Sequence, residues 1–312
     1  MPRRMDRQSQ SPVRRRRGFT LVELLVVVAV VGLLMSILLP VMAKAKIRAR
    51  GVRCLNNYRT LAQGWTMFAD DNNDVMLPGK FASEPGGYSN PKNWYPVGNG
   101  MKFRPPWAAY MGAYVGAFAF NKPRTDTDRQ DFDNEVYINP LRADWKDERN
   151  YSFGYNHQFL GNARRSKSGV FYNYPARRGR LSNFAETVMG ATSIGTAAGF
   201  AQAQRTPYEN DGKKYTSDAN HAWSLDPPRL TSRSDRGSGD ADSPRTAVDD
   251  CFEGRAIAAF LDGHVEARTA ESLGYRQLSG GKFVDLEKVP NLPHNQYFSG
   301  TGRDDAPPAK PQ

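Results

Sequence analysis

The sequence predicts an α+β protein in which a long N-terminal membrane-spanning helix packs on a mostly antiparallel sheet with long irregular loops. Residues 19–43 are mostly apolar and contain one charged residue, and residues 44–70 continue with helical periodicity. Later apolar pieces are short and are separated by turns rich in Gly, Pro and Asn. Of the 312 residues, 39% are hydrophobic, which is enough to build a core and excludes wholesale disorder.

Residues 1–18 form a basic leader. They contain seven arginines and one acid, and so hold more than half of the chain's net charge of +11. The rest of the chain is only mildly basic, and we expect no nucleic-acid partner. Basic residues ahead of an apolar segment hold an N-terminus in the cytoplasm. We therefore expect the C-terminal domain to be periplasmic or extracellular.

Residues 19–43 are long enough for a transmembrane helix, which needs about 20 apolar residues. We expect a single-pass anchor in contact with lipid of the inner (cytoplasmic) membrane. A cleaved secretory signal would have a shorter apolar core and a small-residue cleavage site, whereas residues 42–46 contain two lysines. A plain signal anchor explains the length but not Glu23, because an acid in the membrane costs about 2.5–3.5 kcal/mol on insertion scales.

A third kind of start fits all these features. Residues 18–26, which join Gly18-Phe19 to Glu23, resemble the leader junction of type IV prepilins and type II secretion pseudopilins. The resemblance implies that prepilin peptidase cuts after Gly18 and methylates the new N-terminal amine of Phe19. It also implies that Pro40 is a helix-kinking proline. Glu23 would serve assembly with other pilin-like subunits by pairing with the Phe19 amine of a neighbour, since intramembrane charges are usually paired.

Residues 44–70 should form the exported, amphipathic part of the same helix. Apolar residues recur there at three- and four-residue steps, and six basic residues lie between them. We interpret the basic residues as a solvated face beside lipid headgroups. Gly51 and Gly64 each weaken a helix by roughly 1 kcal/mol, which allows a break near Gly51.

The helix should end at residues 70–74, Asp-Asp-Asn-Asn-Asp. Several hard oxygens close together suit calcium, but the run lacks the glycine and the terminal glutamate of an EF-hand loop. A polar turn that closes the helix is therefore favoured.

A second resemblance covers residues 54–74 and the turn at 262–264. Both resemble a prepilin-like family abundant in verrucomicrobial and planctomycete-type bacteria, which carries a C-terminal His-x9-Asp-Gly signature. The position of the signature's histidine is Phe252 in this chain, so no role of that histidine is carried over.

The exported α+β domain should span residues 71–298. Residues 255–266 predict a strand, a tight Asp-Gly turn and a second strand. We expect a mobile loop at 224–250 and a disordered tail at 299–312, both from their composition. Core packing is favoured for the aromatic clusters, with a carbohydrate-stacking surface as the functional alternative.

The two cysteines, Cys54 and Cys251, leave two alternatives open. On the exported side of a membrane they could form a disulfide if their Cα atoms lie within about 7 Å. Otherwise they are buried free thiols.

The search for catalytic chemistry finds little. The four histidines are too scattered for zinc, and no glycine-lysine pair is followed by Ser or Thr, so there is no P-loop. Asp262 and His264 flank one turn and are more simply a turn-stabilising pair. We expect no enzyme, no metal site and no cofactor.

These observations predict a structural subunit of a type IV pilus-like or type II secretion-like filament, which is extracted from the membrane on assembly. The alternative is a solitary membrane-anchored exported protein that binds a polysaccharide or another surface ligand. Polymerisation separates the two, because the second should stay monomeric after processing.

Overall fold

The computed structural model describes residues 19–127, 129–161, 163–166, 170–209, 215–232, 234, 245–284 and 294–309. The chain divides into two compact units, Met1–Lys46 and Ile47–Gln312. The predicted leader, residues 1–18, lies outside the described residues.

The first described element is one long helix, α1 (Leu21–Asp71). It continues through Pro40 and Gly51, so the break near Gly51 that the sequence allowed does not occur. Residues 47–71 belong to the second unit and bury one face of the helix. The buried residues recur at helical spacing: Gly51, Cys54, Tyr58, Leu61, Ala62, Gly64, Trp65, Phe68 and Ala69.

The largest sheet has four antiparallel strands in the order β3-β6-β7-β8. Their bounds are β3 (Phe153–Tyr155), β6 (Val188–Thr192), β7 (Ala256–Phe260) and β8 (Val265–Arg268). Two further antiparallel pairs are β1 (Trp94–Pro96) with β2 (Met101–Phe103), and β4 (Ala163–Arg165) with β5 (Phe171–Asn173). The predicted α+β class is thereby confirmed, as is the hairpin at residues 255–266.

The four-stranded sheet is covered on both faces. Successive residues of a strand point to opposite sides, and in β7 they enter two different clusters of buried apolar side chains. Ile257 and Ala259 pack in the cluster that contains α1, whereas Ala258 and Phe260 pack in the other cluster. This explains why β7 is a continuous apolar run and not an alternating one.

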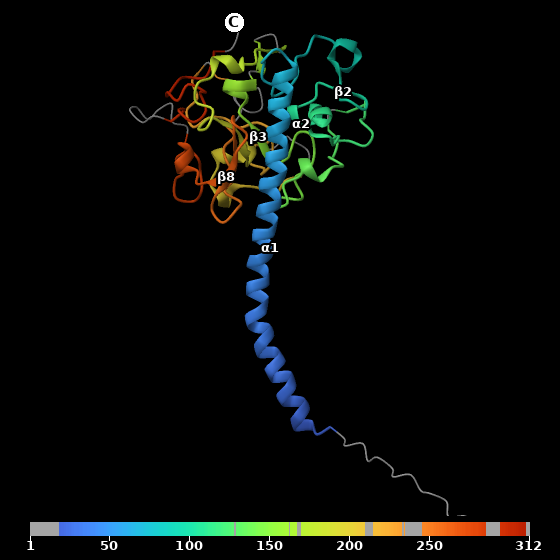
Figure 1. Ribbon diagram of the computed structural model, residues 1–312, viewed down its shortest axis with the longest axis vertical. Helices are drawn as coiled ribbons and strands as arrows, with labels where there is room; N and C mark the ends of the chain where they lie inside the picture. The colour runs from blue at the N-terminus through green and yellow to red at the C-terminus, as the bar shows by residue number, and fades with distance from the viewer. Residues whose placement is uncertain are drawn as a thin grey trace, which may run out of the picture. The chain divides into compact units, whose positions relative to one another are not determined.

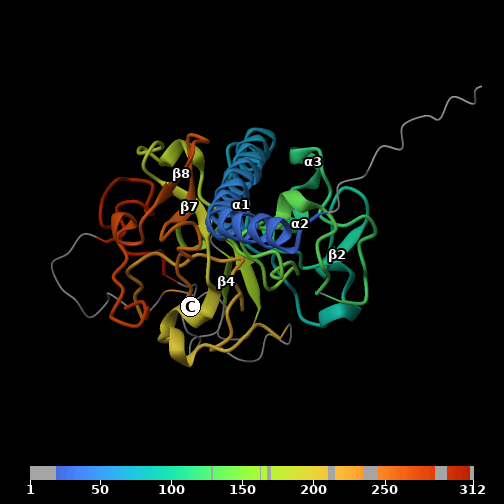
Figure 2. The same cartoon turned by 90° about the horizontal axis from the view of Figure 1, so that it is seen from below.

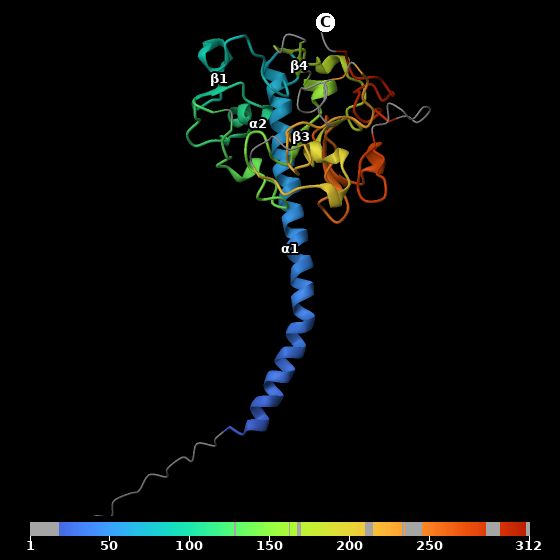
Figure 3. The ribbon, with the colours of Figure 1, turned by 180° about the vertical axis from the view of Figure 1, so that it is seen from behind.

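Aromatic side chains join α1 to this sheet within the second unit. Tyr58 stacks on Phe153 with ring centroids 4.7 Å apart, and Trp65 stacks on Tyr155 at 5.0 Å. Gly190 in β6 leaves room for them, since a Cβ there would lie 2.5 Å from the Tyr58 hydroxyl. Figures 1 to 3 show this part of α1 between the four-stranded sheet on one side and β1, β2 and α2 (Trp107–Tyr110) on the other.

Some apolar pieces expected in the sheet are short helices instead. Residues 107–115 form α2 and α3 (Gly112–Val115), and residues 135–137 form a 3₁₀ turn in which the side chain of Asn134 accepts a hydrogen bond from the N–H of Val136. The remaining short helical segments are Gly87–Ser89, Pro91–Asn93, His157–Gly161, Arg178–Arg180, Gly195–Gly199, Gln202–Gln204 and Glu271–Leu273.

The segment 224–250, expected to be a mobile loop, is anchored at both ends. The described residues there are mostly buried. Asp226 and Thr246 exchange two backbone-to-side-chain hydrogen bonds of 2.8 and 2.9 Å, and the Arg245 guanidinium donates to the carbonyl oxygens of Pro227 and Pro228. The described ends of this segment are therefore held in place, because their polar groups are paired inside the protein. Residues 233 and 235–244 lie outside the described part.

The tail predicted to be disordered from residue 299 is also held in place. The Asp304 carboxylate accepts hydrogen bonds from the backbone N–H groups of His294 and Asn295 at 3.1 and 2.9 Å, and it pairs with Arg229 at 3.0 Å. Residues 310–312 lie outside the described residues.

Candidate processing site and anchor helix

The predicted cleavage junction lies directly before α1. Gly18 is outside the described residues, while Phe19 and Thr20 precede the helix in non-helical conformation. The side chain of Phe19 is 73% exposed. The residue predicted to become the mature N-terminus is thus followed within two residues by regular helix.

Glu23 closes a capping box with Thr20. One carboxylate oxygen accepts hydrogen bonds from the Thr20 N–H and hydroxyl, both at 2.8 Å, and the Thr20 hydroxyl accepts from the Glu23 N–H at 3.2 Å. This reciprocal arrangement satisfies backbone donors that a helix start leaves unpaired. This role was not predicted from the sequence, although Thr-x-x-Glu ahead of an apolar run is the known signal of a capping box.

The first unit presents an apolar surface along α1. Every described residue from 19 to 46 is exposed in the isolated chain, including 17 of the large apolar residues between Leu21 and Met42. Among the described residues, α1 is the one helix whose length and composition suit a membrane span. The cost of exposing so much apolar surface to water is removed when lipid or apolar protein surrounds it.

Two comparisons with known proteins find no match, and the third identifies the N-terminal segment. Residues 13–39 match the family described as the prokaryotic N-terminal methylation motif. Together with the long apolar helix, this match fits a prepilin-like protein with a membrane anchor. No curated protein and no solved structure is similar to the chain at a significant level.

The basic residues after the apolar segment do more than form a solvated face. Within the second unit, Arg48 pairs with Glu253 at 3.0 Å, and Arg53 pairs with Glu135. Both pairs join α1 to segments far away in sequence. Both are also exposed, so each stabilises the contact by at most about 1 kcal/mol.

The acidic run at the end of α1 is bound by an arginine. Arg178 donates to the carboxylates of Asp70 and Asp74 at 2.5 and 2.7 Å, and the N–H of Gly179 donates to Asp74 at 2.7 Å. The carboxylate oxygens of Asp70 and Asp74 thus accept hydrogen bonds from the protein itself, which favours the polar turn over a calcium site.

The two ends of the incomplete His-x9-Asp-Gly signature are Phe252, at the position of the histidine, and the turn between β7 and β8, which contains the Asp-Gly pair. The turn holds a hydrogen bond of 2.6 Å between Asp262 and His264, and the His264 ring stacks on Phe260 at 4.3 Å. These contacts agree with a turn-stabilising pair. Phe252 packs against the cluster of buried side chains that contains α1.

The two cysteines are free in the structure, Cys54 buried and Cys251 half-buried. Burial raises the pKa of both thiols. Of the two alternatives that the sequence left open, a disulfide and free thiols, the structure has the free thiols. Among the described residues there is no group of three or more His, Cys, Asp and Glu side chains that could hold a metal ion.

Proposed function

We propose that this chain is a structural subunit of a type IV pilus-like or type II secretion-like filament, and that prepilin peptidase processes and N-methylates it. The observation that supports this proposal is the methylation motif at residues 13–39, which lies at the start of an exposed apolar helix. In this proposal the N-terminus is cytoplasmic, the second unit is exported, and α1 anchors the chain in the cytoplasmic membrane until assembly. The chain is a substrate of the peptidase and not itself a catalyst.

The capping box suggests how the Glu23 carboxylate is stabilised in the membrane before assembly. Its carboxylate accepts two hydrogen bonds from Thr20 within the same chain, which reduces the cost of removing it from water. After cleavage, the cationic amine of Phe19 on a neighbouring subunit would supply the opposite charge. Glu23 would thus help to form the helix start in one chain and to select a neighbour in the filament.

Mass spectrometry of the mature N-terminus tests the processing step. Protein from cells with active peptidase should begin at Phe19 and carry one additional methyl group. Gly18→Lys should block cleavage, because a long side chain prevents close approach of the backbone to the protease. An intact leader on the wild-type chain would contradict the proposal.

Three variants separate the two roles of Glu23. Glu23→Gln keeps an oxygen that can accept the capping hydrogen bonds but removes the charge, and Glu23→Ala removes both. Thr20→Val removes the hydroxyl contacts of the capping box and keeps the charge of Glu23. If pairing with an amine drives assembly, both Glu23 variants insert into the membrane but are depleted from sedimented filaments, whereas Thr20→Val is incorporated. Normal incorporation of Glu23→Gln would contradict the pairing mechanism.

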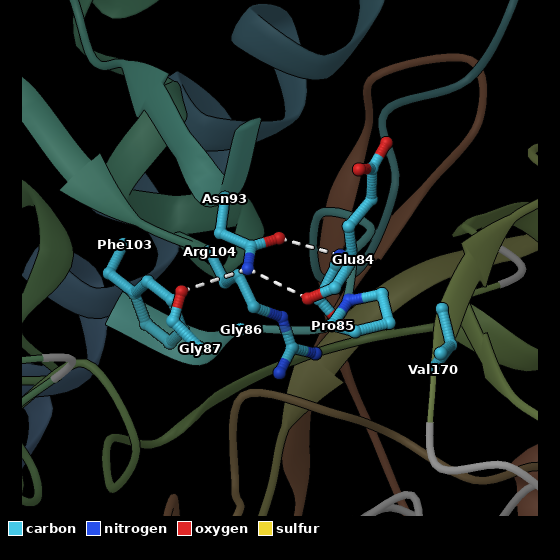
Figure 4. Close-up of a pocket in the computed structure, with 9 residues that line it drawn as sticks. Glu84, Pro85, Gly86, Gly87, Asn93, Phe103, Arg104 and Val170 are labelled. Carbon is cyan, nitrogen blue, oxygen red and sulfur yellow. Dashed lines mark hydrogen bonds between the residues drawn. The ribbon is translucent and has the colours of Figure 1, made fainter. Parts of the chain in front are cut away.

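A second candidate function is a solitary membrane-anchored binding protein. The observation that favours it is a pocket in the second unit, which is lined in part by Asn93, Phe103 and Arg104 (Figure 4). Cross-linking of the processed protein in membranes distinguishes the two. Subunits of a filament give ladders of multimers, whereas a solitary binding protein gives monomers.

A further inference from the structure

A lysine and a glutamate lie buried together in the second unit. Lys102 is the middle residue of β2, and its ammonium lies 2.7 Å from the Glu148 carboxylate, with neither side chain exposed. The ring of Phe120 borders the pair, with its centre 4.8 Å from the ammonium. Well-packed apolar side chains often stabilise a fold as well as a buried ion pair does. Stability alone therefore does not account for these two charges.

A side-chain carboxamide lies beside the same ammonium. Lys102 Nζ donates to the side-chain oxygen of Gln130 at 3.3 Å and to the carbonyl oxygen of Thr127 at 3.3 Å. The carboxamide carbon of Gln130 is bonded to that oxygen at about 1.2 Å, and so lies within about 4.5 Å of Nζ. Atoms poised to react are about 3–3.5 Å apart, so a movement of about 1 Å brings the lysine nitrogen to this carbon.

Backbone contacts hold Gln130 and Glu148 next to each other. The N–H of Glu148 donates to the backbone carbonyl oxygen of Gln130 at 3.0 Å. The carboxamide of Gln130 is oriented as well, because its oxygen accepts from the N–H of Arg124 at 2.9 Å and its nitrogen donates to the carbonyl oxygen of Lys122 at 3.0 Å. The carboxamide oxygen therefore faces the ammonium of Lys102, while the carboxamide nitrogen is bound elsewhere.

The groups around Lys102 are those that amide formation requires. An ammonium becomes a nucleophile when it gives a proton to an adjacent base, and the ion pair itself places the Glu148 carboxylate in contact with it. Negative charge then develops on the carboxamide oxygen of Gln130, to which the N–H of Arg124 already donates. Because water is excluded from the buried pair, these electrostatic interactions are stronger than they would be at the surface.

We propose that Lys102 and Gln130 become joined by an isopeptide bond, with Glu148 as the proton carrier. Lys102 gives one proton to Glu148, and its amine attacks Cδ of Gln130. A second proton passes from the attacking nitrogen to the carboxamide nitrogen, the bond between that nitrogen and Cδ breaks, and ammonia leaves. The ammonia takes the proton from Glu148 and departs as ammonium. One C–N bond forms and one breaks, the carboxylate is regenerated, and nothing is oxidised or reduced.

The bond would close the chain between residues 102 and 130 into a covalent loop. Such a link stabilises a fold mainly by restricting the unfolded chain. Unlike a disulfide, it needs no oxidising compartment. This inference does not depend on filament assembly.

Tryptic peptide mapping by mass spectrometry tests the proposal on full-length protein purified in detergent micelles. Trypsin does not cut after Arg104 or Lys122, because a proline follows each of them. If Lys102 carries the isopeptide bond, trypsin cannot cut after it either. The wild-type protein should then release residues 93–124 joined to residues 130–142, with a mass one ammonia below the sum of the two peptides.

Two other peptide patterns would overturn the proposal. Separate peptides of residues 93–102 and 130–142 would show that Lys102 remains a free amine. A peptide joined to residues 147–149, with the loss of water in place of ammonia, would show that Lys102 forms its amide with Glu148 and not with Gln130.

Variants assign the roles of the three groups. Gln130→Leu should abolish the joined peptide. Glu148→Gln should slow its formation at least about hundredfold, since a positioned general base contributes about 10²–10⁴-fold. Lys146→Met is the matched control, because it breaks a lysine–carboxylate pair that is half-exposed, and it should leave the joined peptide at the wild-type level. Complete joining in a Glu148→Gln protein with wild-type melting temperature would overturn the role of Glu148.

Filament incorporation of Gln130→Leu separates this inference from the proposed function. The variant should be processed and incorporated like the wild-type chain, although its tryptic map lacks the joined peptide. A wild-type chain that is joined but never enters filaments would contradict the proposed function alone, and a wild-type chain that enters filaments without the bond would overturn this inference alone.

Discussion

The ring of Phe252 lies directly against the backbone of Gly51. A Cβ added to Gly51 would fall 2.1 Å from Cε2 of Phe252, far inside van der Waals contact. Phe252 is fixed by the tight turn to Arg255, with two backbone hydrogen bonds of 3.1 and 3.0 Å. Gly51 is therefore present in the helix because Phe252 requires the space, and not to break the helix.

Gly51→Ala should lower the free energy of unfolding by about 1–2 kcal/mol, because overpacking costs more than the gain in helix propensity. Denaturant unfolding in micelles measures the effect. Gly32→Ala on the same helix is the control, since nothing lies within 4 Å of its Cβ position, and it should be neutral or stabilising. Adding Phe252→Ala to Gly51→Ala should give a non-additive loss, and strict additivity would contradict the contact.

Lys102 and Glu148 form a fully buried ion pair at 2.7 Å, and the Lys102 ammonium lies 4.8 Å from the centre of the Phe120 ring. Lys102→Met should cost about 3–5 kcal/mol of stability, because it removes the ammonium that pairs with a fully buried carboxylate. Lys146→Met, which breaks the half-exposed pair with Asp131, should cost less than about 1 kcal/mol. Similar losses for the two variants, measured by denaturant unfolding, would refute the importance of burial.

Cys54 and Cys251 should react slowly in the folded protein. Because burial raises the pKa of both thiols, iodoacetamide should alkylate them at least about tenfold faster after unfolding than before it. Protein isolated from its native compartment without reductant should show two alkylatable thiols once unfolded. If alkylation requires a reductant, the two cysteines are bridged and the free-thiol assignment is wrong.

Asp304 should control the order of the C-terminal residues. Burial acts to raise its pKa, but the hydrogen bonds from Asn295, His294 and Arg229 outweigh it, so the pKa lies below the ordinary value of 3.8. The anchor is therefore fully present above pH 3.8 and is lost as the pH falls through the lowered pKa. Asp304→Ala should accelerate proteolysis after residue 299 at neutral pH, whereas Asp305→Ala, the neighbouring control, should have a smaller effect.

Short-range sequence patterns predicted the long helix and the hairpin of the fold. The apolar run, the amphipathic continuation of α1 and the Asp-Gly hairpin each follow from side-chain periodicity or from turn residues. The methylation motif could also be recognised from the sequence, because its glycine, phenylalanine and glutamate lie at fixed short spacing. Thr20 could have been predicted as a cap in the same way.

The sequence by itself thus determined the long apolar helix, the methylation motif and the α+β class. Only the tertiary structure decided that Gly51 packs against Phe252 and that Lys102 forms an ion pair with Glu148. It also decided that Asn93 and Arg104 line one pocket. It also decided that the ends of the polar segment 224–250 are buried. The physical reason is that a local pattern specifies backbone conformation and which face is apolar, whereas these contacts join residues distant in the chain, whose pairing is fixed by packing and by the need to satisfy buried polar groups.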